Sequence, residues 1–160
     1  MAEKPSFNMS KVSPADKLIL GGAGVYFIWS FFKVWYGYNG PGSEFLGRLG
    51  VSGKINGWHG PTSFAVILAI IALVWVGLRA GGVAMNIGVK AGLIDLVVGG
   101  LALLLTLLGL VVQPGFFGPS WGLFVGIILA AVWTYGAWMK YSEPGTTAAT
   151  PPAGTGGFTS

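Results

Sequence analysis

Four long apolar runs, separated by short polar or glycine-rich segments, dominate the chain. They span residues 18–38, 61–82, 91–113 and 119–141. Each run is close to the roughly 20 residues that a helix needs to cross the hydrocarbon core of a bilayer. The pattern predicts an all-α protein, an integral membrane four-helix bundle over residues 14–141, in which residues 39–60 form the one long loop between spans.

Signals for helix initiation mark the starts of three of these runs. Ser13 can cap the first helix, Pro14 suits its first position, and Asp16 complements the positive end of the helix dipole. We therefore expect this helix to begin near Pro14. Pro61 and Pro119 open the second and fourth runs in a similar way.

Polar segments flank the predicted bundle. Residues 1–13 form a polar tail without the early apolar stretch of a cleaved secretory signal, so we expect the first span to remain in the mature protein. Residues 142–160 are rich in Thr, Pro, Gly and Ala. We expect this tail to be disordered, because it cannot bury enough apolar surface to offset the entropy lost on ordering.

Composition supports a membrane environment. Hydrophobic residues make up 53% of the 160 residues and charged residues only 9%, whereas soluble domains contain about 25% charged residues. A soluble domain of this size could not bury so much apolar surface, so we expect the lipid bilayer to surround the chain. The absence of cysteine excludes disulfides, thiol redox chemistry, iron–sulfur clusters and thiolate zinc sites.

Basic residues predict the orientation of the chain in the membrane. With both termini inside, the basic residues of the cytoplasmic side are Lys4, Lys11, Lys17, Arg79, Lys90 and Lys140. Those outside are Arg48 and Lys54, with Lys33 near the outer end of the first span. This excess predicts that both termini are cytoplasmic. A net charge of +4 in this setting reflects orientation and anionic lipid, so we expect no nucleic-acid partner.

Small residues recur every four positions in the fourth run. The stripe consists of Gly118, Gly122, Gly126, Ala130 and Thr134. In lipid there is little hydrophobic drive between helices, and small residues promote close packing instead. We predict a helix-packing interface here, either inside the bundle or between subunits of a homo-oligomer or a complex with another membrane protein.

Asp95 is the one acid inside a predicted span, and Lys33 is a second ionisable candidate within the membrane. Such a residue in a membrane helix is a functional candidate by default. Asp95, however, lies near the cytoplasmic start of the third span, close to the headgroups and to basic residues of that side. These are Lys90, Arg79 and Lys17. We expect a structural or interfacial Asp95 that does not pair with Lys33, and the alternative is a proton relay.

Aromatic residues surround Lys33 in the sequence WSFFKVWYGY at the end of the first run. Trp29, Trp35, Tyr36 and Tyr38 have the composition of an interfacial belt, and a lysine there can extend its ammonium group to water. We expect these residues to set the depth of the helix in the bilayer and assign them no catalytic role.

The outer loop holds the predicted recognition residues, Phe45, Leu46, Trp58 and His59. The sequence GSEFLGRLG can form one amphipathic turn whose apolar side chains rest on the lipid surface. Further along, an Asn-Gly pair favours a tight turn that delivers Trp58 and His59 to the mouth of the second span.

His59 is the single histidine of the chain. One histidine without cysteine cannot complete a metal site, and a two-histidine site shared by a homodimer would still need further ligands and supporting partners. Glu44 is the one carboxylate predicted outside, and no serine is marked as a nucleophile. We therefore expect no metal, no cofactor and no catalytic residue.

Three segments carry a resemblance to a known class of proteins: SPADKLILGGAGVYFIWSF, NGWHG and WGLFVGIILAAVWTYGAWMKY. Over residues 13–141 the layout resembles small four-span membrane proteins of Gram-positive, actinobacteria-like bacteria, a class without an assigned activity. The resemblance implies a bacterial plasma membrane and supplies no catalytic residues. The single long loop departs from the regular half of a transporter.

We expect a non-enzymatic accessory subunit, scaffold or oligomeric assembly that acts through helix packing and its outer loop. The alternative is a small transport or channel component using Asp95, Thr106 or a subunit interface, which predicts a flux that Asp95→Asn abolishes. The scarcity of polar residues at mid-membrane depth argues against it. A third hypothesis is a membrane subunit that binds a cofactor through His59. It could also bind a lipid or quinone, because sites lined by ordinary apolar side chains leave no motif.

Overall fold

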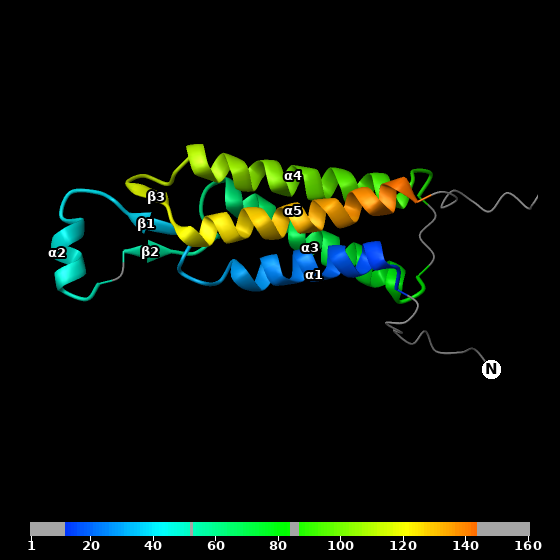
Figure 1. Cartoon of the computed structure of the whole chain (residues 1–160), viewed down its shortest axis with the longest axis horizontal. Coiled ribbons are helices and arrows are strands. Elements are labelled where there is room, and N and C mark those ends of the chain that lie inside the picture. Colours follow the sequence, from blue (N-terminus) through cyan, green and yellow to red (C-terminus); the bar gives the residue numbers. More distant parts are fainter. Residues whose placement is uncertain (1–11, 52, 84–86, 144–160) are drawn as a thin grey trace, which may run out of the picture.

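The computed structural model describes residues 12–51, 53–83 and 87–143, and this part of the chain is 66% helical (Figure 1). In chain order its elements are α1 (Pro14–Trp29), β1 (Tyr36–Tyr38), α2 (Ser43–Arg48), β2 (Lys54–Ile55), α3 (Pro61–Ala80), α4 (Ala91–Val111), β3 (Phe117–Pro119) and α5 (Trp121–Ser142). The two predicted tails lie almost wholly outside the described residues, as do Lys4 and Lys11.

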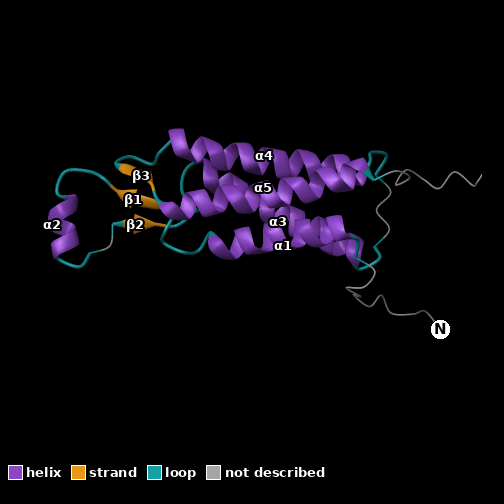
Figure 2. Ribbon diagram, in the orientation of Figure 1, coloured by secondary structure: helices purple, strands orange, loops and turns teal. Residues whose placement is uncertain are grey.

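The helices α1, α3, α4 and α5 lie side by side along the long axis of the molecule (Figure 2). α1 packs against α3 and α5, and α4 packs against the same two helices. Successive helices run in opposite directions (Figure 1), so the chain reverses at each end of the bundle. α3, α4 and α5 are long and apolar enough to cross a membrane, which suggests a transmembrane protein.

The first helix starts where the sequence predicts and stops early. Ser13 is the N-cap, and its hydroxyl accepts a hydrogen bond from the Asp16 N–H over 3.2 Å. The helix ends at Trp29, however, although the apolar run continues to residue 38. The chain turns at Ser30, whose hydroxyl donates to the Phe27 carbonyl over 2.6 Å. The extended first span predicted over 18–38 is therefore wrong as a continuous helix.

A three-stranded antiparallel sheet joins the two loops at one end of the bundle, in the order β2-β1-β3. β1 is the central strand: Tyr36 pairs with Ile55 of β2 and with Pro119 of β3. The all-α prediction missed this sheet, because its strands are only two or three residues long and lie next to apolar runs. Pro119 consequently belongs to β3, and α5 begins at Trp121 after an N-cap at Ser120.

Many of the side chains buried between the helices are small, although large ones such as Trp133 and Tyr26 are buried with them, and further large apolar side chains cover the outside. The buried alanines are Ala15, Ala23, Ala65, Ala69, Ala72, Ala102, Ala130 and Ala137. Leucine, isoleucine, valine and phenylalanine side chains are exposed along the outer faces of α3, α4 and α5. Close packing through small residues is how membrane helices associate, and this distribution agrees with the three apolar spans.

Candidate functional site

One end of the bundle, called the ionic end below, carries charged side chains from four helices. Arg79 of α3 stands between two carboxylates: it donates to Asp16 of α1, and over 2.9 Å to Asp95 of α4. Lys140 of α5 lies 3.2 Å from an Asp16 oxygen and 3.2 Å from a Glu143 oxygen. The network therefore ties α1, α3, α4 and α5 together.

Burial makes these ion pairs part of the fold. Only 1% of the Asp95 side chain is exposed, and a buried carboxylate without a counter-charge is strongly destabilising. Arg79 is the basic residue that pairs with Asp95, out of the three that the sequence offered. Lys33 lies in the turn after α1, at the opposite end of the bundle.

Asp16 is a network residue that the sequence interpretation missed, since it assigned this acid only to the helix dipole. Its carboxylate meets both Arg79 and Lys140. The available signal was an acid and two bases predicted on the same side of the membrane. An acid and two bases on the same side of the membrane can form ion pairs with one another.

Polar side chains halfway along the bundle form hydrogen bonds within the chain. The hydroxyl of Thr106 donates to the Ala102 carbonyl over 2.7 Å, as a threonine in a helix can. It also lies 2.8 Å from the hydroxyl of Tyr26, which is therefore the donor of that bond. The hydroxyl of Thr134 lies 2.7 Å from the Ala130 carbonyl of its own helix and 2.9 Å from the Gly99 carbonyl of α4, and its one proton is shared between these two acceptors.

The small-residue stripe of α5 faces the inside of the bundle. The N–H of Gly122 donates to the Val34 carbonyl over 3.0 Å, and a Cβ at Gly122 would collide with that backbone. A Cβ at Gly126 would lie 2.5 Å from the ring of Trp35. Both glycines thus let the segment after α1 approach α5 closely.

The remaining members of the stripe also contact this chain. Ala130 is fully buried, and Thr134 bonds to α4. Gly118 is not on the helix: it lies in β3, where it pairs with Gly37 of β1. The prediction of one continuous helical stripe from Gly118 is therefore wrong at its first residue.

Trp35 and Tyr36 close the bundle at the sheet end, by which we mean the end that carries the three strands. Both side chains are fully buried, so their assignment to an interfacial belt is wrong. The Trp35 ring meets Tyr26 edge-on at 5.5 Å between centroids, and its Nε1 donates to the Trp29 carbonyl over 2.9 Å. The Tyr36 hydroxyl lies 3.2 Å from that of Thr62.

Backbone hydrogen bonds fix the segment that carries Trp35 and Tyr36 from two sides. The Trp35 N–H donates to the Ile55 carbonyl over 3.2 Å, and the Trp35 carbonyl accepts from Ser120 over 2.9 Å. Gly57, of the predicted Asn-Gly turn, donates to the Ser30 carbonyl over 2.9 Å. The two loops and the end of α1 therefore form one connected cap over the helices.

His59 and Trp58 lie on the cap but differ in exposure. His59 is exposed, and its Nδ1 lies 3.4 Å from the Asn56 carbonyl oxygen. Trp58 is half-buried against Phe31, with 5.7 Å between ring centroids. Among the described residues no group of three or more His, Cys, Asp or Glu side chains could hold a metal ion.

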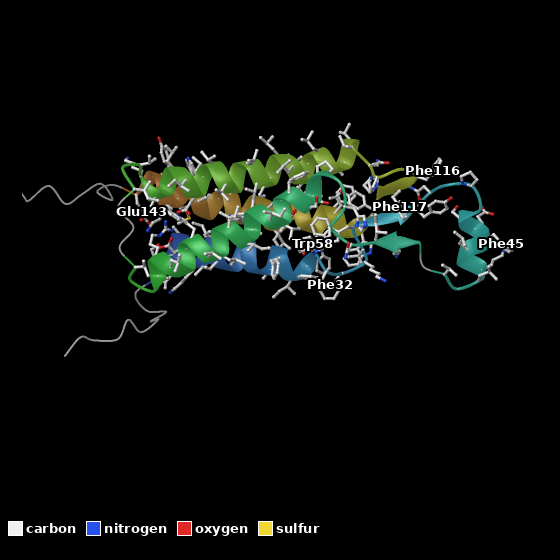
Figure 3. The ribbon with its side chains drawn as sticks, turned by 180° about the vertical axis from the view of Figure 1, so that it is seen from behind. Phe32, Phe45, Trp58, Phe116, Phe117 and Glu143 are labelled. Atoms are coloured by element: carbon white, nitrogen blue, oxygen red, sulfur yellow. The ribbon has the colours of Figure 1, made fainter. Side chains whose placement is uncertain are left out.

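α2 stands at the far end of the molecule, beyond the sheet (Figure 3). Phe45 and Leu49 are exposed there, and Leu46 is half-buried. We expected these apolar residues to rest on the lipid surface. The structure instead places the sheet between α2 and the helices (Figures 1 and 3).

Two hollows border α2. One, of about 490 Å³, is lined by residues 40–45 and Arg48. The other, of about 340 Å³, lies between α2 and the sheet and is lined by residues that include Tyr38, Ser43, Lys54 and Ser120. A further, wholly apolar groove of about 280 Å³ runs along the outside of α3, where bilayer lipid would cover it.

No protein-family model matches the chain, and neither curated proteins nor solved structures gave a significant match. The candidate site therefore has to be assessed from its own geometry.

Proposed function

We propose that the chain is a four-span protein of the bacterial plasma membrane that acts without catalysis, as an accessory subunit, scaffold or oligomeric assembly. Its binding surface would be the sheet end, with α2 at the tip. One observation carries the proposal. The buried charged and hydroxyl groups described above bond to one another or to the backbone, whereas α2 projects beyond the sheet with large apolar side chains exposed.

The packing of α1 supports a fourth span. A helix of 16 residues rises about 24 Å, which is less than the roughly 30 Å of hydrocarbon. α1 nevertheless packs lengthwise between α3 and α5, so it would cross wherever they cross. Local thinning of the bilayer and extension of Lys33 towards water would accommodate the difference.

The charge distribution supports an orientation with the ionic end in the cytoplasm. The basic residues of the ionic end are Lys17, Arg79, Lys90 and Lys140, joined in the sequence by Lys4 and Lys11. Those of the sheet end are Lys33, Arg48 and Lys54. By the positive-inside rule, the sheet end would face the outside, where α2 could meet a partner.

Closure at both ends weighs against the transport alternative. Asp95 is paired with Arg79, and Thr106 bonds to Ala102 and Tyr26. At the sheet end Trp35 fills the space between the helices. A solute passing through the bundle would have to break the Asp95–Arg79 ion pair at one end and displace Trp35 at the other.

Photo-crosslinking in native membranes tests the proposed binding surface. A photoreactive phenylalanine analogue is placed at Phe45, which is 64% exposed on α2, or at Phe64, which is 61% exposed on α3. We expect the Phe45 probe to give a discrete protein adduct and the Phe64 probe to label lipid. The two positions are matched in residue type and exposure, so a difference between them reports location.

A protein adduct equally strong from both positions would contradict the proposal, as would no adduct from Phe45. In either case the sheet end would have no special part in binding. Replacing Phe45 by serine should also remove the partner during purification in mild detergent, because the exposed ring would supply much of the apolar contact.

A further inference from the structure

We propose that a cluster of aromatic side chains at the sheet end, called the aromatic band below, lies among the lipid headgroups and fixes the outer water boundary of the bilayer. The band consists of Phe27, Trp29, Phe31, Phe32, Trp58 and Trp121. Its binding partner is the lipid surface, and the strands and α2 stand in water beyond it. The inference rests on the proposed function, because it takes the helices as spans and the sheet end as external.

One half of the aromatic band is centred on Phe31. Its ring meets Phe27 edge-on at 5.2 Å between centroids and lies 5.7 Å from the ring of Trp58. Phe27 belongs to α1 and Trp58 to the loop before α3, so these contacts join two segments that are distant in the sequence. Phe31 itself is 55% exposed and therefore presents part of its ring to the surroundings of the bundle.

The other half is centred on Trp29 and indicates the depth of the band. The Trp29 ring lies 5.3 Å from that of Phe32 and 5.4 Å from that of Trp121, and its Nε1 donates to the Gly122 carbonyl over 2.9 Å. Trp29 is the last residue of α1, and Trp121 is the first of α5. The band therefore lies at the level where these two helices end, which is where tryptophan is enriched in membrane proteins.

The backbone of the turn that carries Phe31 and Phe32 is suited to the edge of the hydrocarbon. Residues 30–35 are not helical, yet five of their six backbone N–H groups donate to carbonyls within the chain. These five belong to Ser30, Phe31, Phe32, Val34 and Trp35. Irregular backbone at membrane depth requires such internal acceptors, because lipid supplies none. Lys33 is exposed in this turn, and a lysine at this depth can extend its ammonium group to the lipid phosphates.

The character of the exposed side chains changes at the band. Beyond it, charged side chains are exposed at Glu44, Arg48 and Lys54. On the bundle side, α3 and α4 present leucine, isoleucine, valine and phenylalanine to the outside. Figure 3 shows Phe32 and Trp58 where the helices end, whereas Phe45 lies at the far tip of the molecule. The boundary between hydrocarbon and water thus falls at the band.

This boundary restricts the partner of α2. If the lipid surface meets the band, the sheet separates α2 from the lipid, and the exposed ring of Phe45 is surrounded by water. A protein that binds α2 would then have to reach it with a part that also projects from the membrane.

Site-directed spin labelling measures the depth of each level in the full-length, cysteine-free chain. Single cysteines replace Phe32, Phe45 or Ile71, which are 51%, 64% and 48% exposed, respectively, and each carries a nitroxide. The protein is placed in vesicles of phosphatidylethanolamine and phosphatidylglycerol. Collisions with oxygen, which concentrates in hydrocarbon, are compared with collisions with a water-soluble nickel chelate.

We expect oxygen collisions to dominate at position 71, in the middle of α3, and nickel collisions at position 45. Position 32 should lie between them. Nickel access at position 32 equal to that at position 45 would overturn the inference, as would oxygen access at position 45 equal to that at position 71. Nickel access at position 71 would reject the proposed four-span protein as well.

A pair of matched variants tests whether the band fixes the boundary. The reporter is a nitroxide at Ile28→Cys, because Ile28 is 60% exposed on α1, one turn before the band. Replacing Phe31 and Phe32 by serine should raise nickel collisions at position 28 severalfold, since polar side chains move the water boundary towards the bundle. Replacing Phe45 and Leu49 of α2 by serine removes two exposed apolar side chains in the same way and should have no effect. Equal responses of the reporter to the two double substitutions would overturn the inference.

Discussion

Single residues at the ionic end decide whether the bundle stays closed. Arg79 serves two carboxylates through two different nitrogens, so no other basic residue replaces it fully. Lys140 shares Asp16 but forms no ion pair with Asp95. The nearly buried Asp95 therefore depends on Arg79 for its counter-charge.

Arg79→Leu should destabilise the bundle by about 3–5 kcal/mol, because it leaves a buried carboxylate unpaired. Thermal unfolding in mild detergent, followed by tryptophan fluorescence, measures the effect. Lys17→Leu is the control: Lys17 is exposed at the same end, and no ion pair among the described residues involves it.

A double-mutant cycle separates the ion pair from simple loss of packing. Asp95→Leu in the Arg79→Leu background should restore part of the lost stability, since both charges are then gone. If Arg79→Leu were no more destabilising than Lys17→Leu, the network would not be holding the helices together.

Some residues at this scale follow from the sequence and others do not. The cap at Ser13, the start at Pro14 and the proximity of Asp95 to Arg79 follow from local signals and from the membrane side of each residue. The burial of Trp35 does not. A tryptophan near lysine and tyrosine has the same local sequence pattern whether it lies at the membrane interface or is buried at the end of a bundle. Only the turn at Ser30, which the pattern does not reveal, distinguishes the two positions.

At the scale of elements, the distance between helices depends on individual glycines. α1 carries two neighbouring glycines with different surroundings. A Cβ at Gly22 would lie 2.8 Å from the Trp133 Cβ and 2.9 Å from its Cα, whereas a Cβ at Gly21 meets nothing within 4 Å. The contact between α1 and α5 therefore requires glycine at position 22 and accepts alanine at position 21.

Gly22→Ala should lower the thermal stability of the detergent-solubilised protein, because the Trp133 backbone cannot move without displacing α5. Gly21→Ala should leave stability unchanged or raise it by up to about 1 kcal/mol, as alanine is the better helix former. Equal effects of the two substitutions would show that α1 and α5 do not approach as described.

The elements themselves were only partly predictable. The apolar runs located α3, α4 and α5 to within about two residues at each end, whereas the signals at Ser13 and Pro14 located only the start of α1. The sheet was not predictable, because its register depends on pairing between segments about 20 and 80 residues apart in the chain, as between Tyr36 and Ile55 or Pro119. Strands this short have no alternating pattern of their own.

At the scale of the whole molecule, the two ends of the bundle have different tasks. The ionic end closes the helices through paired charges. The sheet end closes them with Trp35 and extends outward through the strands to α2. A membrane protein organised in this way would offer its partners the tip, which is the basis of the proposed function.

The proposed function requires that α1 crosses the membrane, so that the ionic end and the sheet end of the bundle lie on opposite sides. The central measurement uses single-cysteine variants of the cysteine-free chain in intact cells, labelled with a membrane-impermeant maleimide. Glu44→Cys, on α2, should be labelled at once. Lys17→Cys, at the start of α1, should be labelled only after the cells are permeabilised.

Lys90→Cys, before α4, should behave like Lys17→Cys because both belong to the ionic end. Labelling of position 44 from outside, with positions 17 and 90 protected, would establish that α1 and α3 cross the membrane and that α2 is external. Labelling of positions 17 and 44 from the same side would contradict the proposed topology and remove the basis for the external binding surface.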